Sequence, residues 1–537
     1  MKNKIYIKQW LALKPQNYSG STDLYYLKIA NKIKSSLAET EVMMLSRLLD
    51  DDKINDLCCF LTCYFEDVVS EVNIWGAFKS EYAKLYDKKL PFFEIDDDYI
   101  DEEINLLDVV FLMWYYINAL QDHMFISPFN TILFDIAASV MLEFDEEYEF
   151  APENGQLKKC YHFEVSNDDN TFYETRTFIQ HAFFEAYLFQ PDIKKRLDNS
   201  VFKLIEDNKG GDPEMVMGFM RSITEDYAFN QHSKLLALTA KEWSCAILGN
   251  STEESKGVST LSKKIQGLFL FKKQDEASVY LEHIASGLPF EMTKKSFDHA
   301  NELSKDDIIY IGLVNYKNEW WFSGNYIKKG FDADLILDER NSTTSRAEVN
   351  FLSDKKEVKN VLELQKQAFI KFNDNELIAF ITSTEVENFV NNYMSFYNDS
   401  LQLSDVEISE ANKRTRADGY FGNKSVFEKF DKDKEAMIVF FNENQGIEFY
   451  VDVIGAFPGK NNPFFEKEIK EDVQHILMSD NCSTEFANYL VDNYKDRLEY
   501  FETEPYKSYL NDLDFLLRFW KHGNYHTESN VVMTGGY

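Results

Sequence analysis

The stretch "PFFEIDDDYIDEEINLLDVVFLMWYYINAL" (residues 91–120) joins a run of acidic residues to a dense apolar block. Residues 106–120 are apolar on nearly every face of a helix, a pattern that predicts a helix buried at the centre of a domain. Seven carboxylates lie just before it, between Glu94 and Glu103. Carboxylates in a first helical turn are stabilised by the helix dipole, by about 0.3–1 kcal/mol each. We therefore expect the acidic run to begin this helix, which explains some of its charge but not all of it.

The acidic character extends well beyond this run. No Lys or Arg occurs from Leu90 to Leu157, a span of 68 residues with 16 Asp and Glu, and the whole chain has a formal charge of -34. Such charge repels nucleic-acid phosphates and anionic lipids, because both are bound through Lys and Arg. It leaves basic proteins or cations as partners, or no partner at all if the carboxylates only keep the protein soluble.

Size and composition indicate a folded, multidomain protein. A chain of 537 residues exceeds what one hydrophobic core usually serves, so we expect two to four domains. The hydrophobic fraction of 44% and the aromatic fraction of 15% are too high for a disordered chain. The N-terminus has no signal-peptide pattern, since Lys8 and Lys14 interrupt any apolar run. The most apolar segment, residues 106–120, is too short to span a bilayer, so we expect a cytoplasmic protein without membrane contact.

The periodicity of apolar residues changes along the chain, and it predicts an α+β multidomain fold. Apolar residues recur at helical spacing over residues 1–250, which predicts a helical N-terminal domain. A polar stretch, "GNSTEESKGVSTLS", follows and marks a boundary. We expect a small β-rich domain over 258–350, with a curved sheet or an SH3-like barrel, and an α+β domain over 351–537 that contains a hairpin at 435–457.

The prediction of the β-rich domain rests on the residue patterns of four segments. "KIQGLFLFKK" (264–273) and "PFEMTKKSF" (289–297) read as strands, and "DEASVYLEHIAS" (275–286) reads as a short helix. "DDIIYIGLVNYKNEWWFSGNYIKK" (306–329) alternates in part and has a turn at its centre, which predicts a hairpin.

The acidic segments are the leading candidate for a functional surface. We interpret the chain as a non-enzymatic interaction protein whose acidic face docks a basic protein surface, mainly gaining association rate and selectivity. DNA mimicry is a special case, in which ordered carboxylates take the place of phosphates. The residues assigned to this face are Asp96, Asp97, Asp98, Asp101, Glu102, Glu103, Glu143, Asp145, Glu146 and Glu147.

The tandem tryptophans Trp320 and Trp321 are a second candidate. Neighbouring side chains on a strand point to opposite faces, so one ring is expected in a core and the other on a partner-binding face. The competing interpretation is that both rings are buried between domains.

Catalytic and metal motifs are sparse, and no cofactor is expected. Cys58, Cys59 and Cys63 lie close together, but no second cysteine pair completes a structural zinc site, and their apolar neighbours favour core packing. The chain has no GxxxxGK[ST], GxGxxG, GxSxG or HExxH motif. The alternative function is a divalent-metal-dependent enzyme that uses clustered carboxylates. Its carboxylates would be Asp332, Asp334, Asp338 and Glu339.

Several long segments also resemble a known family. "FISPFNTILFDIAASVMLEFDEEYEFAPEN" (125–154), "LTAKEWSCAILGN" (238–250), "FLFKKQDEASVYLEHIASG" (269–287) and "EWWFSG" (319–324) are similar to a "domain of unknown function" family found chiefly in Bacteroides and its relatives. The resemblance covers residues 4–350, and the tail resembles an accessory C-terminal module of the same group. It implies a bacterial, soluble, intracellular protein of mixed helical and β character, and it supplies no activity, catalytic residue or cofactor.

Overall fold

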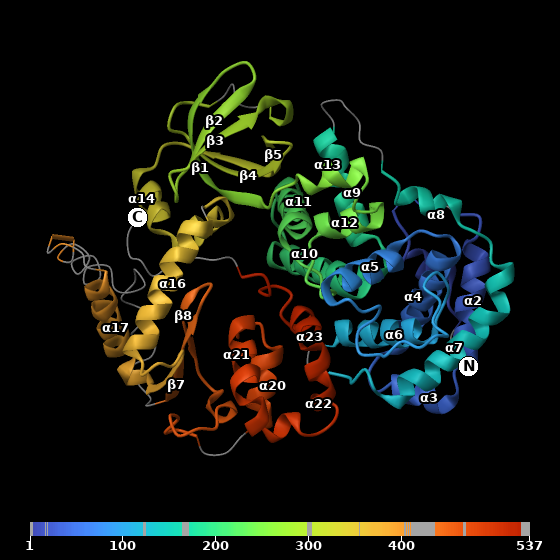
Figure 1. Cartoon of the computed structure of the whole chain (residues 1–537). Helices are drawn as coiled ribbons and strands as arrows, with labels where there is room; N and C mark the ends of the chain where they lie inside the picture. The colour runs from blue at the N-terminus through green and yellow to red at the C-terminus, as the bar shows by residue number, and fades with distance from the viewer. Residues whose placement is uncertain are drawn as a thin grey trace. The chain divides into compact units, whose positions relative to one another are not determined.

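The computed structural model divides the chain into two compact units (Figure 1). We call Met1–Ala333 the N-terminal unit and Asp334–Tyr537 the C-terminal unit. The structure describes residues 4–527 apart from 17, 19, 122–124, 164–170, 298–302, 354, 402, 403, 405, 408, 410–434 and 466–468. The predicted α+β multidomain fold is confirmed. The domain boundaries predicted near 250 and 350 stay predictions.

Helices form the first part of the N-terminal unit, and several begin at a side chain that caps them. Asp50 accepts a hydrogen bond from the Lys53 N–H at the start of α4, and Thr239 forms a capping box with Glu242 at the start of α12. The helices are α1 (Ile7–Leu11), α2 (Asp23–Ser36), α3 (Glu39–Leu45), α4 (Asp51–Val69), α5 (Ile74–Tyr86), α6 (Leu106–Leu120), α7 (Thr131–Glu147), α8 (Gly155–Cys160), α9 (Thr171–Phe184), α10 (Lys195–Asp207), α11 (Pro213–Asn230), α12 (Ala240–Leu248) and α13 (Glu253–Ser259).

Helix α6 lies in the centre of this helical region, as its apolar sequence predicts. Every side chain from Val109 to Met113, on all sides of the helix, is 0% exposed. Its Phe111 packs against Trp75 and Phe78 of α5, with ring centroids 5.9 and 5.1 Å apart. A helix buried on every face needs neighbours all round, and α4, α5 and α7 supply them.

The chain then forms a closed five-stranded barrel in the order β1-β2-β3-β5-β4. Strands β3 and β5 pair in parallel, and antiparallel pairing of β1 with β4 closes the barrel. The domain predicted as a curved sheet or an SH3-like barrel is thus a closed barrel. Its strand order is that of the OB-fold, a five-stranded Greek-key barrel. The strands are β1 (Lys264–Gln274), β2 (Ser278–His283), β3 (Pro289–Thr293), β4 (Ile308–Tyr316) and β5 (Glu319–Lys329).

One element of the barrel differs from its prediction. The segment expected as a helix at 275–286 contains strand β2, which pairs with β1 and β3 on either side. Its Glu, Ala and Leu residues favour a helix locally. However, Val279, Leu281 and His283 alternate into the barrel and are buried, and burial at every second position requires a strand. The other three segments are strands as predicted.

The C-terminal unit contains a three-stranded sheet with helices packed on both faces. Strand β7 divides the core: Met437 and Val439 pack with the α16 and α17 side chains, whereas Ile438 and Phe440 pack with those of α20 and α21. The predicted hairpin at 435–457 is confirmed by β7 and β8. The elements are α14 (Ala333–Asn341), α15 (Thr343–Ala347), α16 (Lys355–Phe372), β6 (Ile378–Thr382), α17 (Val386–Ser400), β7 (Ala436–Asn442), β8 (Gly446–Tyr450), α20 (Lys470–Met478), α21 (Thr484–Tyr494), α22 (Tyr506–Tyr509) and α23 (Leu513–Trp520).

A buried carboxyl group in α4 should make the stability of the N-terminal unit depend on pH. Asp67 is 2% exposed and accepts hydrogen bonds from the backbone N–H groups of Ile74 and Trp75 and from the Tyr187 hydroxyl. Burial raises the pKa of Asp67 to about 6, although these hydrogen bonds lower it. A pKa raised above its ordinary value of 3.8 means that Asp67 stabilises the fold below about pH 3.8 and that this contribution is lost as the pH rises through about 6.

Asp67→Asn is therefore expected to flatten the pH dependence of unfolding. A pKa change from 3.8 to about 6 corresponds to about 3 kcal/mol between mildly acidic and neutral pH. The measurement is urea denaturation of both proteins from about pH 4 to about pH 7, followed by tryptophan fluorescence. Identical pH slopes for the variant and the wild type would contradict the assignment.

Candidate functional site

The acidic run lies in a loop between α5 and α6, and we call residues 94–103 the acidic loop. The prediction that it forms the first turn of the buried helix is wrong, because α6 begins at Leu106. The physical reason is Asn105. Its side-chain amide donates to the carbonyl oxygens of Ile100 (2.8 Å) and Glu103 (2.9 Å) and accepts from the Ile100 N–H (3.1 Å). These bonds hold the preceding backbone in turns rather than in a helix.

The acidic loop is anchored to the core by one buried side chain. Tyr99 is 8% exposed, and its hydroxyl donates to the Asp108 carboxylate at 2.8 Å. Asp108 also accepts from the Tyr64 hydroxyl at 3.0 Å and from the Trp75 indole at 2.9 Å. Burial raises the pKa of Asp108, and the three hydrogen bonds oppose that rise. The loop is thus fixed at its midpoint while its carboxylates face solvent.

The carboxylates of the acidic loop are exposed and mostly lack cationic partners. Asp101 forms an ion pair with Lys89 at 2.8 Å. Within the described part of the chain, no ion pair forms at the other predicted positions of the loop, which are Asp96, Asp97, Asp98, Glu102 and Glu103. Several like charges without counter-charges produce a strong local negative potential.

The second predicted acidic segment, at the end of α7, presents less unpaired negative charge to solvent than expected. Glu147 is 9% exposed, where it accepts from the Lys32 ammonium at 2.6 Å and from the Tyr25 hydroxyl at 2.5 Å. The hydrogen bonds from Lys32 and Tyr25 lower the pKa of Glu147. Glu147 therefore stabilises the α2–α7 contact and presents little of its carboxylate to solvent.

The remaining carboxylates of this segment stay near the surface. Asp145 and Glu146 are exposed, Glu143 is half-buried, and Glu146 lies 3.6 Å from the Lys32 ammonium. Burial and, to a smaller extent, the charge of Glu103 raise the pKa of Tyr148, so the Tyr148 hydroxyl at the end of α7 lies within electrostatic reach of the acidic loop.

Large apolar side chains are exposed among these acids. Ile100 in the acidic loop is 51% exposed, Leu142 in α7 is 68% exposed, and Phe150 just after α7 is 74% exposed. Aromatic and aliphatic side chains of this kind serve as anchors in protein interfaces, whereas the surrounding charges steer association.

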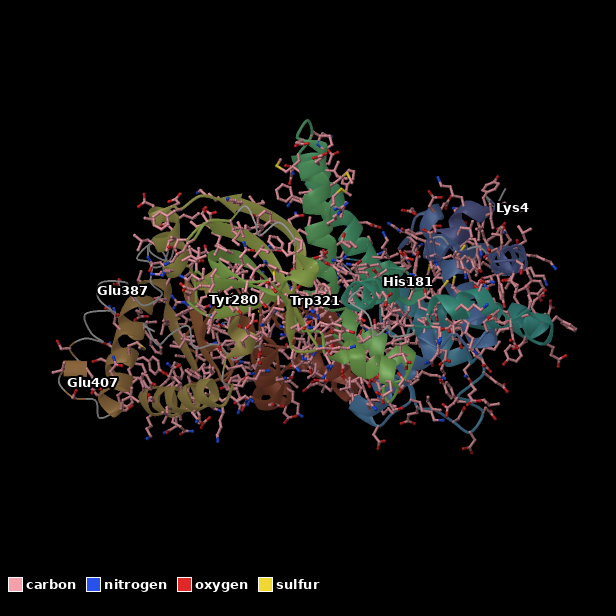
Figure 2. All side chains as sticks on the ribbon, turned by 90° about the horizontal axis from the view of Figure 1, so that it is seen from above. Lys4, His181, Tyr280, Trp321, Glu387 and Glu407 are labelled. Atoms are coloured by element: carbon pink, nitrogen blue, oxygen red, sulfur yellow. The ribbon has the colours of Figure 1, made fainter. Side chains whose placement is uncertain are left out.

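The tandem tryptophans pack on opposite sides of β5, and both rings contact the chain itself. Trp321 is 4% exposed and stacks on Phe172 of α9 at 5.0 Å, where the barrel meets the helices (Figure 2). Trp320 is half-buried against Phe290, with ring centroids 5.0 Å apart. Trp321 is thus a packing residue and does not serve as an exposed anchor; only Trp320 keeps part of its surface in solvent.

The outer face of β2 and β3 is where OB-fold barrels commonly bind oligonucleotides or oligosaccharides. In this barrel the face carries carboxylates as well as lysines: Lys272 pairs with Glu282 at 2.9 Å, and the Lys273 ammonium lies 4.5 Å from the centroid of the Tyr280 ring. Tyr280 of β2, which is labelled in Figure 2, donates its hydroxyl to Asp275 at 2.9 Å. Glu291 of β3 accepts from Ser278 at 2.8 Å. Carboxylates at these positions oppose phosphate binding, so the barrel alone does not indicate a nucleic-acid interface.

The residues proposed for metal binding are close in sequence, but their side chains do not form a cluster in the part of the chain that the structure describes. Among the described residues, no group of three or more His, Cys, Asp or Glu gathers as a metal site. Asp332 pairs with Lys329 at 2.9 Å, and Asp334, Asp338 and Glu339 lie on α14. The cysteines of α4, Cys58, Cys59 and Cys63, are buried in the core with free thiols.

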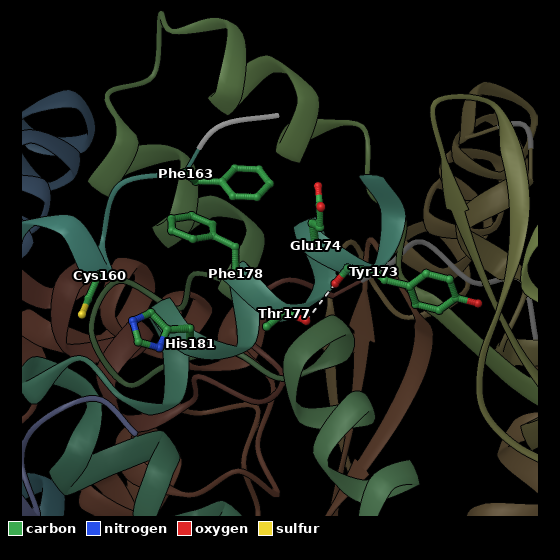
Figure 3. Close-up of a pocket in the computed structure, with 7 residues that line it drawn as sticks. All are labelled: Cys160, Phe163, Tyr173, Glu174, Thr177, Phe178 and His181. Atoms are coloured by element: carbon green, nitrogen blue, oxygen red, sulfur yellow. Dashed lines mark hydrogen bonds between the residues drawn. The ribbon is translucent and has the colours of Figure 1, made fainter. Parts of the chain in front are cut away.

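An open pocket of about 570 Å³ lies along α9 (Figure 3). Its walls are mostly apolar, and one end holds an imidazole and a thiol. This site was not predicted from the sequence. His181 and Glu185, four residues apart in a region predicted to be helical, could have indicated a His–Glu contact there. The residues that line the pocket are Cys160, Phe163, Tyr173, Glu174, Thr177, Phe178 and His181.

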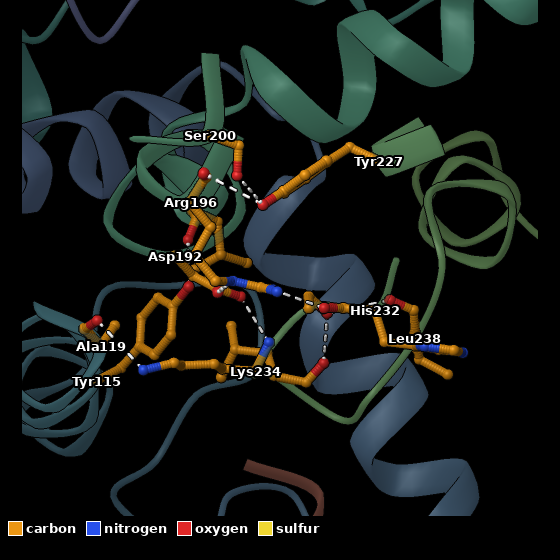
Figure 4. A network of polar contacts seen from close by, with 12 residues as sticks. Tyr115, Ala119, Asp192, Arg196, Ser200, Tyr227, His232, Lys234 and Leu238 are labelled. Carbon is orange, nitrogen blue, oxygen red and sulfur yellow. Dashed lines mark hydrogen bonds and ion pairs between the residues drawn. The ribbon is translucent and has the colours of Figure 1, made fainter. Parts of the chain in front are cut away.

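A separate polar cluster holds the turn that leads into α12 (Figure 4). Asp192 is 1% exposed and accepts from the Arg196 guanidinium at 2.8 Å and from the Lys234 N–H at 2.5 Å. Leu236 and Ala237 in this turn are buried and have φ angles of 59° and 50°. Left-handed backbone at non-glycine residues costs about 1–3 kcal/mol each and persists only where surrounding contacts impose it. The cluster therefore serves to position the turn and α12.

By its fold, the chain is an α+β multidomain protein that carries an anchored acidic loop. It belongs to the family described as "Protein of unknown function (DUF3843)", whose model matches residues 4–285. The match covers the acidic loop and the α9 pocket and ends between β2 and β3, inside the barrel. Comparison with curated proteins and with solved structures finds no match. Within the described residues, no helix combines the length and the apolar character needed to cross a membrane.

Proposed function

We propose that this chain is an interaction protein that docks a basic protein surface onto the acidic loop and the adjoining end of α7. One observation carries the proposal: five exposed carboxylates without a described cationic partner lie on a loop that Tyr99 anchors to the core. A preformed loop loses little conformational entropy on binding, so its charges can contribute to association from the start.

The neighbouring apolar side chains support the same proposal. Charge alone gives association rate and selectivity, whereas affinity needs side chains that a partner can bury. Ile100, Leu142 and Phe150 supply that exposed apolar area beside the carboxylates. In this proposal the protein acts in the cytoplasm of a bacterium related to Bacteroides, and the C-terminal unit is an accessory module.

The test compares two variants that remove the same amount of charge from different places. The loop variant combines Asp96→Asn, Asp97→Asn, Asp98→Asn, Glu102→Gln and Glu103→Gln. Asp101 is kept because it pairs with Lys89. The matched control neutralises five exposed carboxylates of the C-terminal unit, through Glu387→Gln, Glu471→Gln, Asp492→Asn, Asp496→Asn and Glu502→Gln.

Wild type, loop variant and control are used to capture partners from a bacterial lysate at low and moderate salt, and the captured protein is then purified for rate measurements. We expect the loop variant alone to lose the partner, with an association rate lower by about 10- to 1,000-fold, and we expect added salt to weaken wild-type binding. Equal binding by all three proteins, or equal loss in both variants, would rule out docking at this loop. If the partner binds DNA, displacement by duplex DNA would identify the special case of DNA mimicry.

A further inference from the structure

The α9 pocket is lined by an imidazole and a thiol, and a carboxylate contacts the imidazole, independently of the acidic loop. The Nδ1 atom of His181 lies 2.9 Å from the Glu185 carboxylate, which also accepts from the Gln16 N–H at 2.7 Å. Burial by itself raises the pKa of Glu185, but the bonds from His181 and Gln16 outweigh burial and lower it. Glu185 is therefore ionised at neutral pH and holds the imidazole proton on Nδ1.

An imidazole that carries its proton on Nδ1 alone has a lone pair on Nε2. In His181 this atom is buried and accepts no hydrogen bond from any residue that the structure describes. The Tyr161 ring packs on the imidazole with centroids 5.2 Å apart and helps to hold its orientation. A nitrogen that is oriented by a carboxylate and has no partner of its own is suited to accept a proton.

The candidate to lose that proton is the thiol of Cys160. Cys160 ends α8, is half-exposed and lines the same pocket as His181 (Figure 3). Burial and the Glu185 charge raise the pKa of this thiol, so it is protonated at neutral pH. A protonated thiol becomes a strong nucleophile only when a base takes its proton during the attack.

The rest of the pocket fits an apolar group. Phe163 stacks on Phe178 with ring centroids 4.8 Å apart, and Tyr173 lies farther along the same wall (Figure 3). A pocket of about 570 Å³ is large enough for a small ligand with an acyl chain.

We propose that the α9 pocket is an acyl-transfer site, in which Cys160 is the nucleophile, His181 the general base and Glu185 a positioning residue. The donor is an ester or thioester with an apolar acyl chain. As the Cys160 sulfur attacks the carbonyl carbon, its proton passes to Nε2 of His181. The bond from that carbon to the leaving oxygen or sulfur then breaks, the leaving group takes the proton from His181, and the acyl group remains on Cys160.

The experiment uses p-nitrophenyl octanoate and the full-length protein. We expect the release of about one p-nitrophenol per chain and the mass of one octanoyl group on the peptide that contains Cys160. Cys160→Ala should abolish both signals, and Cys482→Ala, which changes a buried thiol of the C-terminal unit, should leave both unchanged. An equal adduct on other cysteines, or no adduct on Cys160, would overturn the proposal.

Two further variants separate a chemical role from a structural one. His181→Ala is expected to slow acylation by about 10²- to 10⁴-fold, and added imidazole should restore part of the rate. Glu185→Gln should lower the maximal acylation rate while leaving the half-saturating ester concentration unchanged. If folded His181→Ala reacts at the wild-type rate, the assignment of the base is wrong; if this variant does not fold, Glu185→Gln provides the same test.

Discussion

Asp108→Leu is expected to lower the free energy of unfolding of the N-terminal unit by about 3–6 kcal/mol. The substitution removes the acceptor of three buried donors, the hydroxyls of Tyr64 and Tyr99 and the indole N–H of Trp75. Each buried donor left without a partner costs about 1–3 kcal/mol, because it cannot recover a hydrogen bond to water. The measurement is urea denaturation followed by tryptophan fluorescence.

The matched control is Tyr99→Phe, which removes one of these donors together with its hydrogen bond. It should cost about 0.5–1.5 kcal/mol. Both variants release the anchor of the acidic loop, so amide hydrogen exchange in residues 96–103 should become faster in both. A loss below about 1 kcal/mol for Asp108→Leu would contradict the network.

Glu66→Leu is expected to destabilise the N-terminal unit by about 3–5 kcal/mol. Glu66 forms an ion pair with Lys14, and both side chains are almost fully buried. Burial disfavours the charged form of Lys14, but its contacts with Cys63 and Glu66 keep its pKa above the ordinary value. Removing Glu66 leaves a buried ammonium without its counter-charge, which is the costly way to break such a pair.

The double variant Lys14→Met, Glu66→Leu separates the cost of an unpaired charge from the value of the ion pair. Replacing both members of a buried ion pair with apolar residues is often neutral or stabilising, so the double variant should recover most of the loss. Urea denaturation of the wild type, Lys14→Met, Glu66→Leu and the double variant completes the double-mutant cycle. Equal destabilisation by the single and double variants would show that the lost packing of Glu66, rather than the unpaired Lys14, is responsible.

Local sequence patterns predicted correctly those segments whose own residues dictate which side chains are buried. The apolar block 106–120 has no polar face to turn to water, so its central position in a core was predictable and is confirmed. The hairpin formed by β4 and β5 was predictable for a similar reason, since its alternation and its turn lie within one short segment. The acidic character of residues 94–103 was equally plain, and their exposure follows from the cost of burying charge.

The elements that were mispredicted depend on partners far away in the sequence. Strand β2 has helix-forming residues, but pairing with β1 and β3 on both sides overrides that preference. The segment before α6 turns because Asn105 bonds to the backbone of the loop and Tyr99 reaches Asp108.

The fold class, the central helix and the sign of the exposed charge follow from the sequence, because periodicity and charge act through neighbouring residues. Which carboxylates remain exposed depends on the tertiary structure, since Glu147 is buried where it contacts Tyr25 and Lys32. It also decided which chemical groups share a pocket. Cys160 and His181 lie on different helices, α8 and α9, and only the tertiary structure places both of them on the wall of one pocket.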